Sequence, residues 1–515
     1  MAPDRGLRGD EAIVGRAIVG RAIVGNAVMG EVVMTAGNDP RPLVRFGRRQ
    51  SKGVLLGLSG VRLATLATAI LVMTVGVFAF GIAGLIVSAP AWSGLAAAAF
   101  LRWQGRPAIE SAGVLAHWAV RVATGQTRFT VRPSALRPAG TMALPGDAAA
   151  LRFHTEQRTG AVMVHDPHRQ TLSAMVHVTH PAYVLLSPDE QARRVTAWST
   201  AIAGLAGSGS CPSVQVLEST LPDPGHGVRA WLSSHGVEDG AWASKEYSAL
   251  VEQLAPTSFK HRTLISLTVD LKRSASAVRG AGRGIAGAAE VLRRDMSAFE
   301  VSLRSADLRI RRWMTAPELA VVIRQAYDPA ADAMLHTDAG ANLTHAGPVA
   351  VDERWDHLRH DGAYSRVLWI SEWPRTQVAP DFLHALVFEP GIRKSISVVA
   401  KPLATAEALR AIRKEKVEYL TEAQQSSRIG RLTDLSAEQE YGDVITRERA
   451  LASGHTDLRF SGFICVTAPT HESLIASVAS VERAASQCGC ETRVLVGQQA
   501  SAFVVAALPL GRAAR

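Results

Sequence analysis

Four histidines lie close together in the sequence and are its clearest candidates for metal chemistry. They form two H-x-x-H pairs within 16 residues: His165, His168, His177 and His180. The residues between them are typical of a β-hairpin with its turn at Asp166-Pro167, which could bring four imidazoles toward one ion. However, residues i and i+3 of a strand point to opposite faces, so neither pair is suited to chelation. We keep these histidines as weak metal candidates and expect no bound metal.

Two further clusters could bind metal or do acid–base chemistry. Cys488-Gly-Cys490 has neither a second cysteine pair nor a nearby histidine, so it lacks the ligand set of a zinc site. An acidic stretch could hold a metal or exchange protons, although a solvated helix end explains it more simply. Its members are Asp352, Glu353, Asp356 and Asp361, together with His357 and His360.

Nucleotide chemistry has no support in the sequence. A Walker A loop needs a lysine directly after a glycine, and none of the eight lysines has that neighbour. The G-x-G-x-x-G motif, Gly282, Gly284 and Gly287, begins 12 residues after the strand expected to end near Asp270, too far for a dinucleotide-binding turn. G-x-S-x-G and H-E-x-x-H motifs are also absent. The sequence therefore predicts no catalytic residue, no cofactor and no enzyme.

Composition divides the chain into a basic N-terminal part and a near-neutral remainder. Residues 1–150 contain 16 Lys and Arg against 7 Asp and Glu, whereas the rest contains 40 against 39. A nucleic-acid-binding domain normally has a local basic excess, so direct nucleic-acid binding is not expected of the large C-terminal part. Four scattered cysteines indicate a reducing compartment rather than a disulfide framework.

A long uncharged segment explains where the basic excess lies. Residues 63–101 contain no Asp, Glu, Lys, Arg or His. As one helix they would extend ~58 Å, about twice the thickness of the hydrocarbon core of a bilayer. We therefore predict two transmembrane helices, about 63–81 and 84–101, with the turn near Gly81–Gly84. A turn at Ser88-Ala-Pro90 is the alternative.

Basic residues flank both ends of this predicted hairpin. Arg45, Arg48, Arg49, Lys52 and Arg62 precede it, and Arg102 and Arg106 follow it. The positive-inside rule then places both termini and the bulk of the chain in the cytoplasm, behind the inner membrane. Residues 108–125 have the spacing of an amphipathic helix that lies on the membrane or on the next domain.

The first residues carry a five-residue repeat, from EAIVG at Glu11 to Thr35. A period of five matches neither a helix nor a strand, and charges interrupt the apolar run. We interpret residues 1–45 as an unstructured leader, and Met34 rather than Met1 is a possible start.

The remaining chain is predicted as a mixed α+β or α/β protein. The membrane region spans 46–130, a Pro- and Gly-rich linker spans 131–150, and two cytoplasmic α/β domains span 151–330 and 331–515. Strands and helices alternate in both domains, ending with a predicted strand at 502–510. No internal repeat of domain size is visible. Two long polar helices, about 404–426 and 436–453, are a candidate docking surface for another subunit.

Several sequence blocks together resemble one family. RRQSKGVLLGLSGVRLATLATAI and the hairpin resemble the PrgI-like membrane subunits of Gram-positive conjugation machines. RRWMTAPELAVVIRQAYDP, RWDHLRHDGAYSRVLWISEWPR, GHTDLRFSGFICVTA and GQQASAFVVAALPLGR are similar to an actinobacterial family in which this hairpin is fused to the N-terminal, non-motor part of type IV secretion ATPases. The similarity covers roughly residues 45–515, and its specificity lies in the order of the blocks.

The resemblance implies a scaffold in an inner-membrane translocation channel. Its partners would be the lipid bilayer, a separate ATPase and a polytopic channel subunit, in an oligomeric assembly. A type VII secretion membrane subunit is the alternative, because such subunits also combine two N-terminal helices with a cytoplasmic α/β domain. A membrane-tethered enzyme that uses the histidine or acidic cluster is a further alternative.

Overall fold

The structure is a computed structural model of the full chain. It describes residues 32–33, 43–44, 60–103, 106–132, 134, 137–179, 186–208, 213–223, 225–236, 241–254, 259–333, 341–374, 376, 378–403, 405–428, 435–452 and 457–513. The pentapeptide repeat lies outside these residues except for Val32–Val33, which pairs as β1 with β2, Leu43–Val44.

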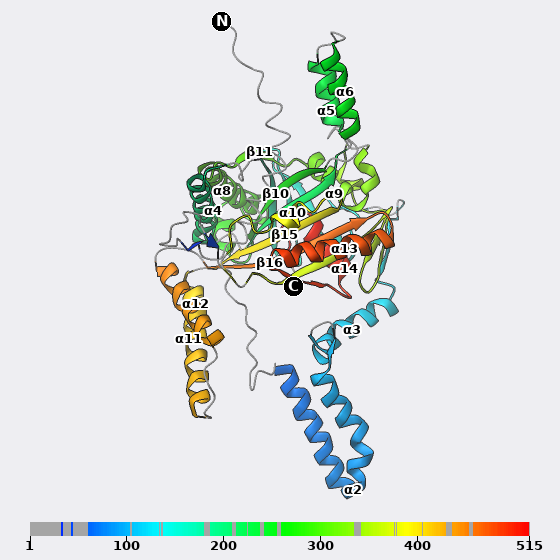
Figure 1. The fold of residues 1–515 in the computed structure, drawn as a ribbon, viewed down its shortest axis with the longest axis vertical. Helices are drawn as coiled ribbons and strands as arrows, with labels where there is room; N and C mark the ends of the chain where they lie inside the picture. The colour runs from blue at the N-terminus through cyan, green and yellow to red at the C-terminus, as the bar shows by residue number, and fades with distance from the viewer. Residues whose placement is uncertain are drawn as a thin grey trace.

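The N-terminal part is dominated by a long apolar segment that is helical on both sides of a break at Gly81. Helix α2 spans Gly60–Phe100, and the two-residue strands β3, Arg102–Trp103, and β4, Arg106–Pro107, follow it. Helix α3, Ala108–Ala123, then leads into strand β5, Arg128–Thr130. Figure 1 shows α2 standing away from the folded body, with α3 between them.

The folded body is built from two successive groups of elements. The first contains η1 (Gly146–Ala150), β6 (Arg152–Thr155), β7 (Val162–Asp166), β8 (Thr171–Thr179), α4 (Pro188–Ser208), β9 (Ser213–Pro222), α5 (His226–His235), α6 (Trp242–Leu254), β10 (Phe259–Asp270), α7 (Ala275–Gly280), α8 (Gly284–Ser305), β11 (Arg309–Trp313), α9 (Ala316–Tyr327) and η4 (Pro329–Ala333).

The second group has a similar succession of strands and helices. It contains η5 (Leu343–His345), β12 (Ala350–Glu353), β13 (Leu358–His360), β14 (Ala363–Glu372), α10 (His384–Val387), β15 (Arg393–Pro402), α11 (Thr405–Arg428), α12 (Leu435–Ala452), β16 (Leu458–Ala468), α13 (His471–Gln487), β17 (Glu491–Val494) and α14 (Gln499–Ala507).

Both groups contribute to one 13-stranded sheet. Its order is β5-β12-β13-β14-β16-β15-β9-β10-β8-β7-β6, with β11 added on β8 and β17 on β14. The mixed helix-and-sheet composition is as predicted. Every ladder among the described strands is antiparallel, so the α+β alternative fits, whereas the α/β alternative with its parallel sheet is wrong. The two predicted domains share this sheet, because β9 pairs directly with β15.

Each face of the sheet is covered by helices. On one face α4, α8, α10 and α13 bury side chains such as Trp198, Phe299 and Leu474 against the central strands. On the other face α9 and α14 bury Tyr327 and Phe503. The long central strands are buried along nearly their whole length, and because successive residues point to opposite faces, both faces of the sheet are covered.

Two segments differ from the sequence predictions. The apolar run predicted as a last strand forms helix α14, because a short apolar stretch suits a buried helix as well as a strand. The predicted linker is partly packed, since Met142 and Leu144 are buried in the core cluster beneath α9 and α14. Irregular backbone can therefore contribute apolar side chains to a core.

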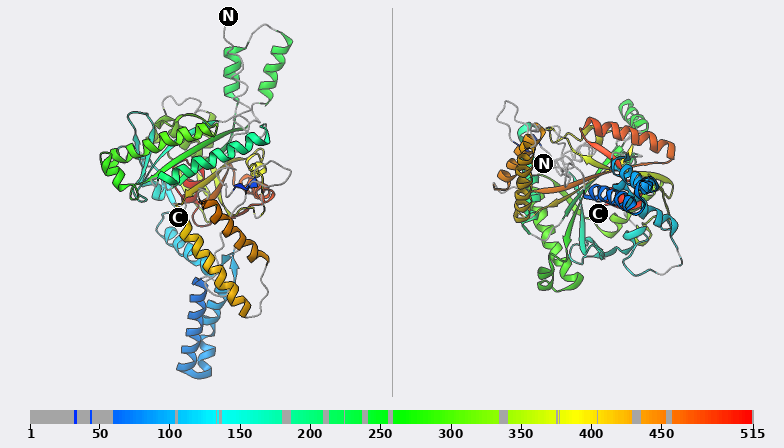
Figure 2. Two further views of the ribbon diagram at one scale, coloured as in Figure 1. Left: turned by 90° about the vertical axis from the view of Figure 1, so that its left-hand side faces the viewer. Right: turned by 90° about the horizontal axis from the view of Figure 1, so that it is seen from below.

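Two helical pairs project from the body in opposite directions. The pair α5–α6 joins β9 to β10, and the pair α11–α12 joins β15 to β16. Figures 1 and 2 show α11–α12 on the same side of the body as α2, and α5–α6 on the opposite side. We call these pairs the distal arm (α5–α6) and the membrane-side arm (α11–α12).

Candidate functional site at the membrane junction

Helix α2 has the length and exposure of a membrane segment. It is long and apolar enough to cross a membrane by length and composition, and only 6% of its most apolar 18 residues are buried within the protein. Phe78, Ile82 and Val87 are exposed by 86%, 83% and 77%. A core helix of a soluble protein would bury such side chains, because exposing them to water is unfavourable. The exposed apolar surface of α2 therefore fits a lipid environment.

The helix is interrupted at Gly81. This residue has φ 59° and ψ −143°, which favours glycine because a side chain would clash with the backbone there. Beyond the break, Gly84 lies so close to Gly76 that a Cβ on Gly84 would overlap the carbonyl oxygen of Gly76. A Cβ on Gly76 would lie 2.6 Å from Ser88 Oγ. Small residues at these positions let the segments on either side of the break approach closely.

Helix α3 connects α2 to the folded body through one buried carboxylate. Arg121 of α3 forms an ion pair with Glu353 of β12, whose side chain is 1% exposed. Arg121 also donates a hydrogen bond of 3.3 Å to the carbonyl oxygen of Gly497. Glu353 in turn accepts the backbone N–H of Ala500 at the start of α14, at 3.0 Å. One carboxylate thus links α3, the sheet and α14.

Aromatic packing supports the same junction. The rings of Trp118 on α3 and Trp355 meet edge to face, with centroids 5.7 Å apart. Gly497 has φ +67°, and a Cβ on it would lie 2.8 Å from Trp355 and 3.2 Å from Val114. The turn before α14 therefore needs glycine for its backbone conformation and for the approach of α3. Val114, Trp118 and Arg121 of α3 therefore contact the folded body, while the position of this amphipathic helix relative to a membrane stays a prediction.

The membrane-side arm has a small core of its own. Leu403, Ala408, Ile412, Val444 and Leu451 form a cluster that is separate from the two clusters of the sheet. Arg447 of α12 pairs with Glu415 of α11 at 3.1 Å and with Asp457 at 2.9 Å. On the outer face of α11, Val417 and Leu420 are 62% and 54% exposed. The arm is thus an internally braced projection that presents apolar side chains to solvent.

The predicted metal candidates do not converge. His165 of β7 lies opposite Leu172, five residues along β8 from His177, which is ~17 Å in an extended strand. His168 is in the turn, and His180 lies outside the described residues. Burial lowers the pKa of His165, as does the nearby His154. Within the described residues, no group of three or more His, Cys, Asp or Glu side chains is placed to hold a metal.

The two cysteines are buried in the core, and the residues of the acidic stretch form ion pairs. Cys488 and Cys490 are buried thiols, and burial raises the pKa of each. The acidic residues do not gather around a common point, because each has a separate basic partner: Asp352 pairs with Arg354, Glu353 with Arg121, Asp356 with Arg366 and Asp361 with Arg324. Within the stretch, Asp356 also lies 2.7 Å from Nδ1 of His357.

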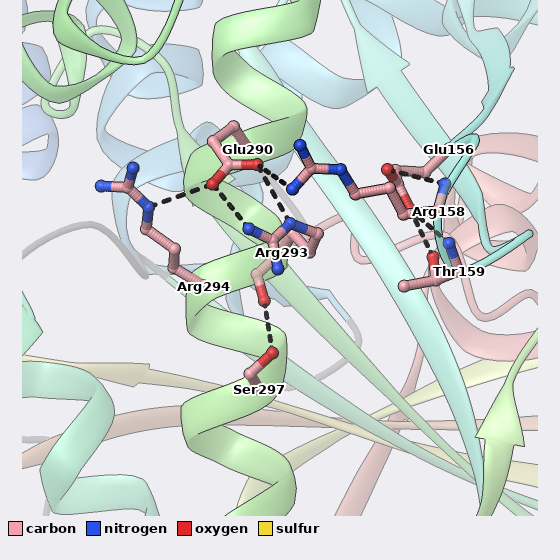
Figure 3. A network of polar contacts seen from close by, with 7 residues as sticks. All are labelled: Glu156, Arg158, Thr159, Glu290, Arg293, Arg294 and Ser297. Atoms are coloured by element: carbon pink, nitrogen blue, oxygen red, sulfur yellow. Dashed lines mark hydrogen bonds and ion pairs between the residues drawn. The ribbon is translucent and has the colours of Figure 1, made fainter.

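Another carboxylate, Glu290 of α8, is enclosed by arginines (Figure 3). It accepts hydrogen bonds from Arg293 and Arg294 and pairs with Arg158, which follows β6. The Arg293 hydrogen bond lowers the pKa of Glu290 to about 2. A carboxylate that stays ionised under physiological conditions is a poor general acid. The pair between Arg158 and Glu290 instead links α8 to the β6–β7 turn.

The basic residues predicted to flank the membrane segment fall into two groups. Arg45, Arg48, Arg49 and Lys52 lie outside the described residues. Arg62 lies in the first turn of α2, while Arg102 and Arg106 belong to β3 and β4. The junction residues Arg121 and Glu353 are 232 positions apart, so nothing in the sequence indicated that they meet.

A comparison with protein families identifies one similarity. Residues 257–370 match the family model described as "EccE: Putative type VII ESX secretion system translocon, EccE". No curated protein matches the chain. The matched segment runs from just before β10 to near the end of β14, and so crosses from the first group of elements into the second. This similarity to a secretion translocon component supports membrane association and favours the type VII alternative over the type IV interpretation.

Proposed function

We propose that this chain is a membrane-anchored subunit of a type VII ESX-like secretion translocon. The similarity of residues 257–370 to a translocon family carries the proposal. The exposed apolar helix α2 and its braced attachment through Glu353 support it, because they are the parts needed to hold a cytoplasmic body at a membrane.

In this proposal α2 crosses the membrane twice. Its 41 residues would extend ~62 Å as a straight helix, about twice the hydrocarbon thickness. The break at Gly81 and the close approach of Gly76 to Gly84 support a hairpin. Both ends then lie on one side, with the folded body in the cytoplasm. A reporter that is active only outside the cytoplasm, fused after Arg515, should stay inactive; activity would overturn this topology.

The proposed role is that of a scaffold rather than an enzyme. We assign the membrane-side arm as the docking surface for a separate ATPase, because it projects beside α2 and exposes Val417 and Leu420. Val417 and Leu420 are three residues apart and so share one face of α11, and contiguous exposed apolar surface marks interaction sites.

The first experiment is isolation of the native protein from its own membranes in mild detergent, followed by mass spectrometry. Type VII subunits that co-purify would support the proposal. A Walker-bearing conjugation ATPase with a polytopic channel subunit would instead favour the type IV interpretation suggested by the sequence blocks. A protein that purifies alone and monomeric would contradict both.

The docking surface is tested with the double variant Val417→Asp, Leu420→Asp. We expect it to lose the ATPase while remaining in the membrane fraction, because two charges would be buried unpaired in the interface. Val301→Asp is the matched control, since Val301 is 66% exposed on α8 and lies outside both arms. Unchanged ATPase recovery with the double variant would refute the assignment of this arm.

A further inference from the structure

The order of strands in the sheet repeats itself. In the first group β7, β8, β10 and β9 lie side by side, and in the second group β13, β14, β16 and β15 do so in the corresponding order. Each group begins with an outer strand, β6 or β12, and each adds a short strand, β11 or β17, on its third strand. The helical arms are inserted at the same step, and α8 and α13, then α9 and α14, follow in turn.

We infer that residues 152–327 and 350–507 are two copies of one structural unit, joined about an approximate two-fold axis at the β9–β15 pair. We call them the N-terminal repeat and the C-terminal repeat. The antiparallel pairing of β9 with β15 brings equivalent strands together, as an approximate two-fold axis requires. By this equivalence the distal arm is the counterpart of the membrane-side arm.

Hydrogen bonds between side chains support the equivalence independently of strand order. Ser173 lies opposite Thr268 on β8 and β10, and their hydroxyl oxygens are 3.0 Å apart. Ser365 lies opposite Thr467 on β14 and β16, and their hydroxyl oxygens are 2.7 Å apart. Both pairs are buried, so the same polar contact occurs at the same register position of each repeat.

The two cores follow the same register. Counting from these hydroxyl pairs, Ile265 and Leu267 of β10 correspond to Ile464 and Val466 of β16, and all four face the helices α4, α8, α10 and α13. Leu264 corresponds to Phe463, and both face α9 and α14. This agreement on both faces supports the register of the two repeats, since a one-residue slip would exchange the faces.

The repeats also hold one another through reciprocal ion pairs. Asp166, at the β7–β8 turn of the N-terminal repeat, accepts a hydrogen bond of 2.9 Å from Arg512, which follows the C-terminal repeat. Asp361, at the β13–β14 turn of the C-terminal repeat, lies 2.9 Å from Arg324 of the N-terminal repeat. Each turn is thus held by an arginine that follows the last strand of the other repeat: Arg512 follows β17, and Arg324 follows β11.

Each of these carboxylates also caps backbone amides. Asp166 Oδ1 accepts the N–H groups of His168 and Arg169 at 3.0 and 3.1 Å. Asp361 Oδ1 accepts the N–H groups of Val349 and Ala350 at 2.8 and 3.0 Å. A change of either arginine should therefore alter hydrogen exchange of the pair of amides that its carboxylate partner caps, Val349 and Ala350 for Arg324 and His168 and Arg169 for Arg512.

Amide hydrogen exchange of the full chain in detergent tests these two contacts between the repeats. In Arg324→Gln we expect the amides of Val349 and Ala350 to exchange about tenfold faster, and those of His168 and Arg169 to be unchanged. In Arg512→Gln we expect the reverse. Arg304→Gln is the control, because Arg304 pairs with Glu300 within α8, and it should alter the exchange of neither amide pair.

The experiment needs no partner protein, so each result bears directly on the contacts between the two repeats. Faster exchange of both amide pairs, of neither pair, or of the pair opposite to the one expected for each variant would overturn the reciprocal assignment. If a glutamine variant does not fold, Asp166→Asn and Asp361→Asn remove the charge while keeping an amide-capping oxygen, and must show the same selectivity. The experiment uses the purified chain alone, so its failure is distinct from failure of the translocon proposal.

Discussion

The two repeats share a strand order but differ at the residue that faces the membrane junction. The register makes Glu353 of β12 the counterpart of Phe153 of β6, because each lies one strand out from the equivalent residues Leu358 and Val164. Phe153 is packed in an apolar core, whereas Glu353 is paired with Arg121 of α3. The attachment to the membrane segment is therefore a property of one repeat, created by a charged residue at a position that is apolar in the other.

A second difference concerns the hairpin turns. The position of Asp166 in β7 corresponds to that of His360 in β13. His360 is fully buried and donates from Nδ1 to the carbonyl oxygen of Tyr327 at 2.6 Å. Its Nε2 then accepts from the hydroxyl of Ser365 at 2.7 Å. The C-terminal repeat therefore carries a buried group whose charge depends on pH, at a position where the N-terminal repeat carries a paired carboxylate.

The largest effect should come from Glu353→Ala. Removing one partner of a buried pair leaves the other uncompensated, so we expect a loss of about 3 kcal/mol in the free energy of unfolding. Hydrogen exchange in α3 should rise with it. Arg128→Ala is the matched control, because Arg128 is 75% exposed in its pair with Asp352 and should have little effect. If Glu353→Ala and Arg128→Ala lower the free energy of unfolding equally, the Arg121–Glu353 pair does not stabilise the junction more than an exposed pair does.

The next effect is a pH dependence that originates in the C-terminal repeat. Burial lowers the pKa of His360 to about 4, below its ordinary value of 6.5. The unfolded chain therefore binds a proton more readily between these values, and stability falls as pH drops from 6.5 toward 4, by up to about 3 kcal/mol. We expect His360→Gln to flatten the dependence of the thermal midpoint on pH in this range.

His165 provides the comparison for this titration in the N-terminal repeat. Its pKa is also lowered, so it contributes in the same direction. His165→Gln should flatten the profile less than His360→Gln does, since His165 is 9% exposed and His360 is 0% exposed. A larger effect of His165→Gln would show that the pH dependence belongs to the N-terminal repeat.

A smaller effect tests the equivalence of the repeats directly. Thr268→Val and Thr467→Val each remove one hydroxyl of a matched buried pair, and each should cost about 1 kcal/mol in the free energy of unfolding. Denaturation monitored by tryptophan fluorescence in detergent would measure both. Costs that differ by more than about 2 kcal/mol would indicate that the two hydroxyl pairs have unlike environments.

The smallest effect is expected from Glu290→Gln. Glu290 interacts with arginines at the surface of the N-terminal repeat, where water and salt screen charges. The thermal midpoint at neutral pH should stay unchanged within error. Because the pKa of Glu290 is lowered, any contribution of the carboxylate is present above its ordinary range and disappears as pH falls toward 2. A clear loss of stability at neutral pH would show that this network contributes to folding stability, contrary to the expectation.

Much of the local structure could be predicted from sequence. The sequence predicts a strand that ends near Asp270 and two long polar helices at about 404–426 and 436–453, and the structure has β10, α11 and α12 there. The apolar run of α14 was misassigned, since its residues are buried on all sides and carry no period. The antiparallel sheet was also missed, because alternation of strands and helices does not fix strand direction.

The candidate sites were less predictable. The histidines and acidic residues chosen by their type do not come together at one site. The junction depends instead on the pair of Arg121 and Glu353, which belongs to no sequence motif. The duplication was hidden for a related reason. Equivalent positions hold different residues, such as Phe153 and Glu353, and only the paired registers bring the correspondence out.

The sequence by itself determined the long uncharged segment, the basic residues around it and the types of most helices and strands, because these depend on composition and on short-range periodicity. The tertiary structure alone decided which strands are neighbours, which repeat carries the membrane junction and which arginine holds which turn. Those contacts join residues as far apart as Asp166 and Arg512, and burial makes each pairing specific, since a charge left unpaired there would be costly.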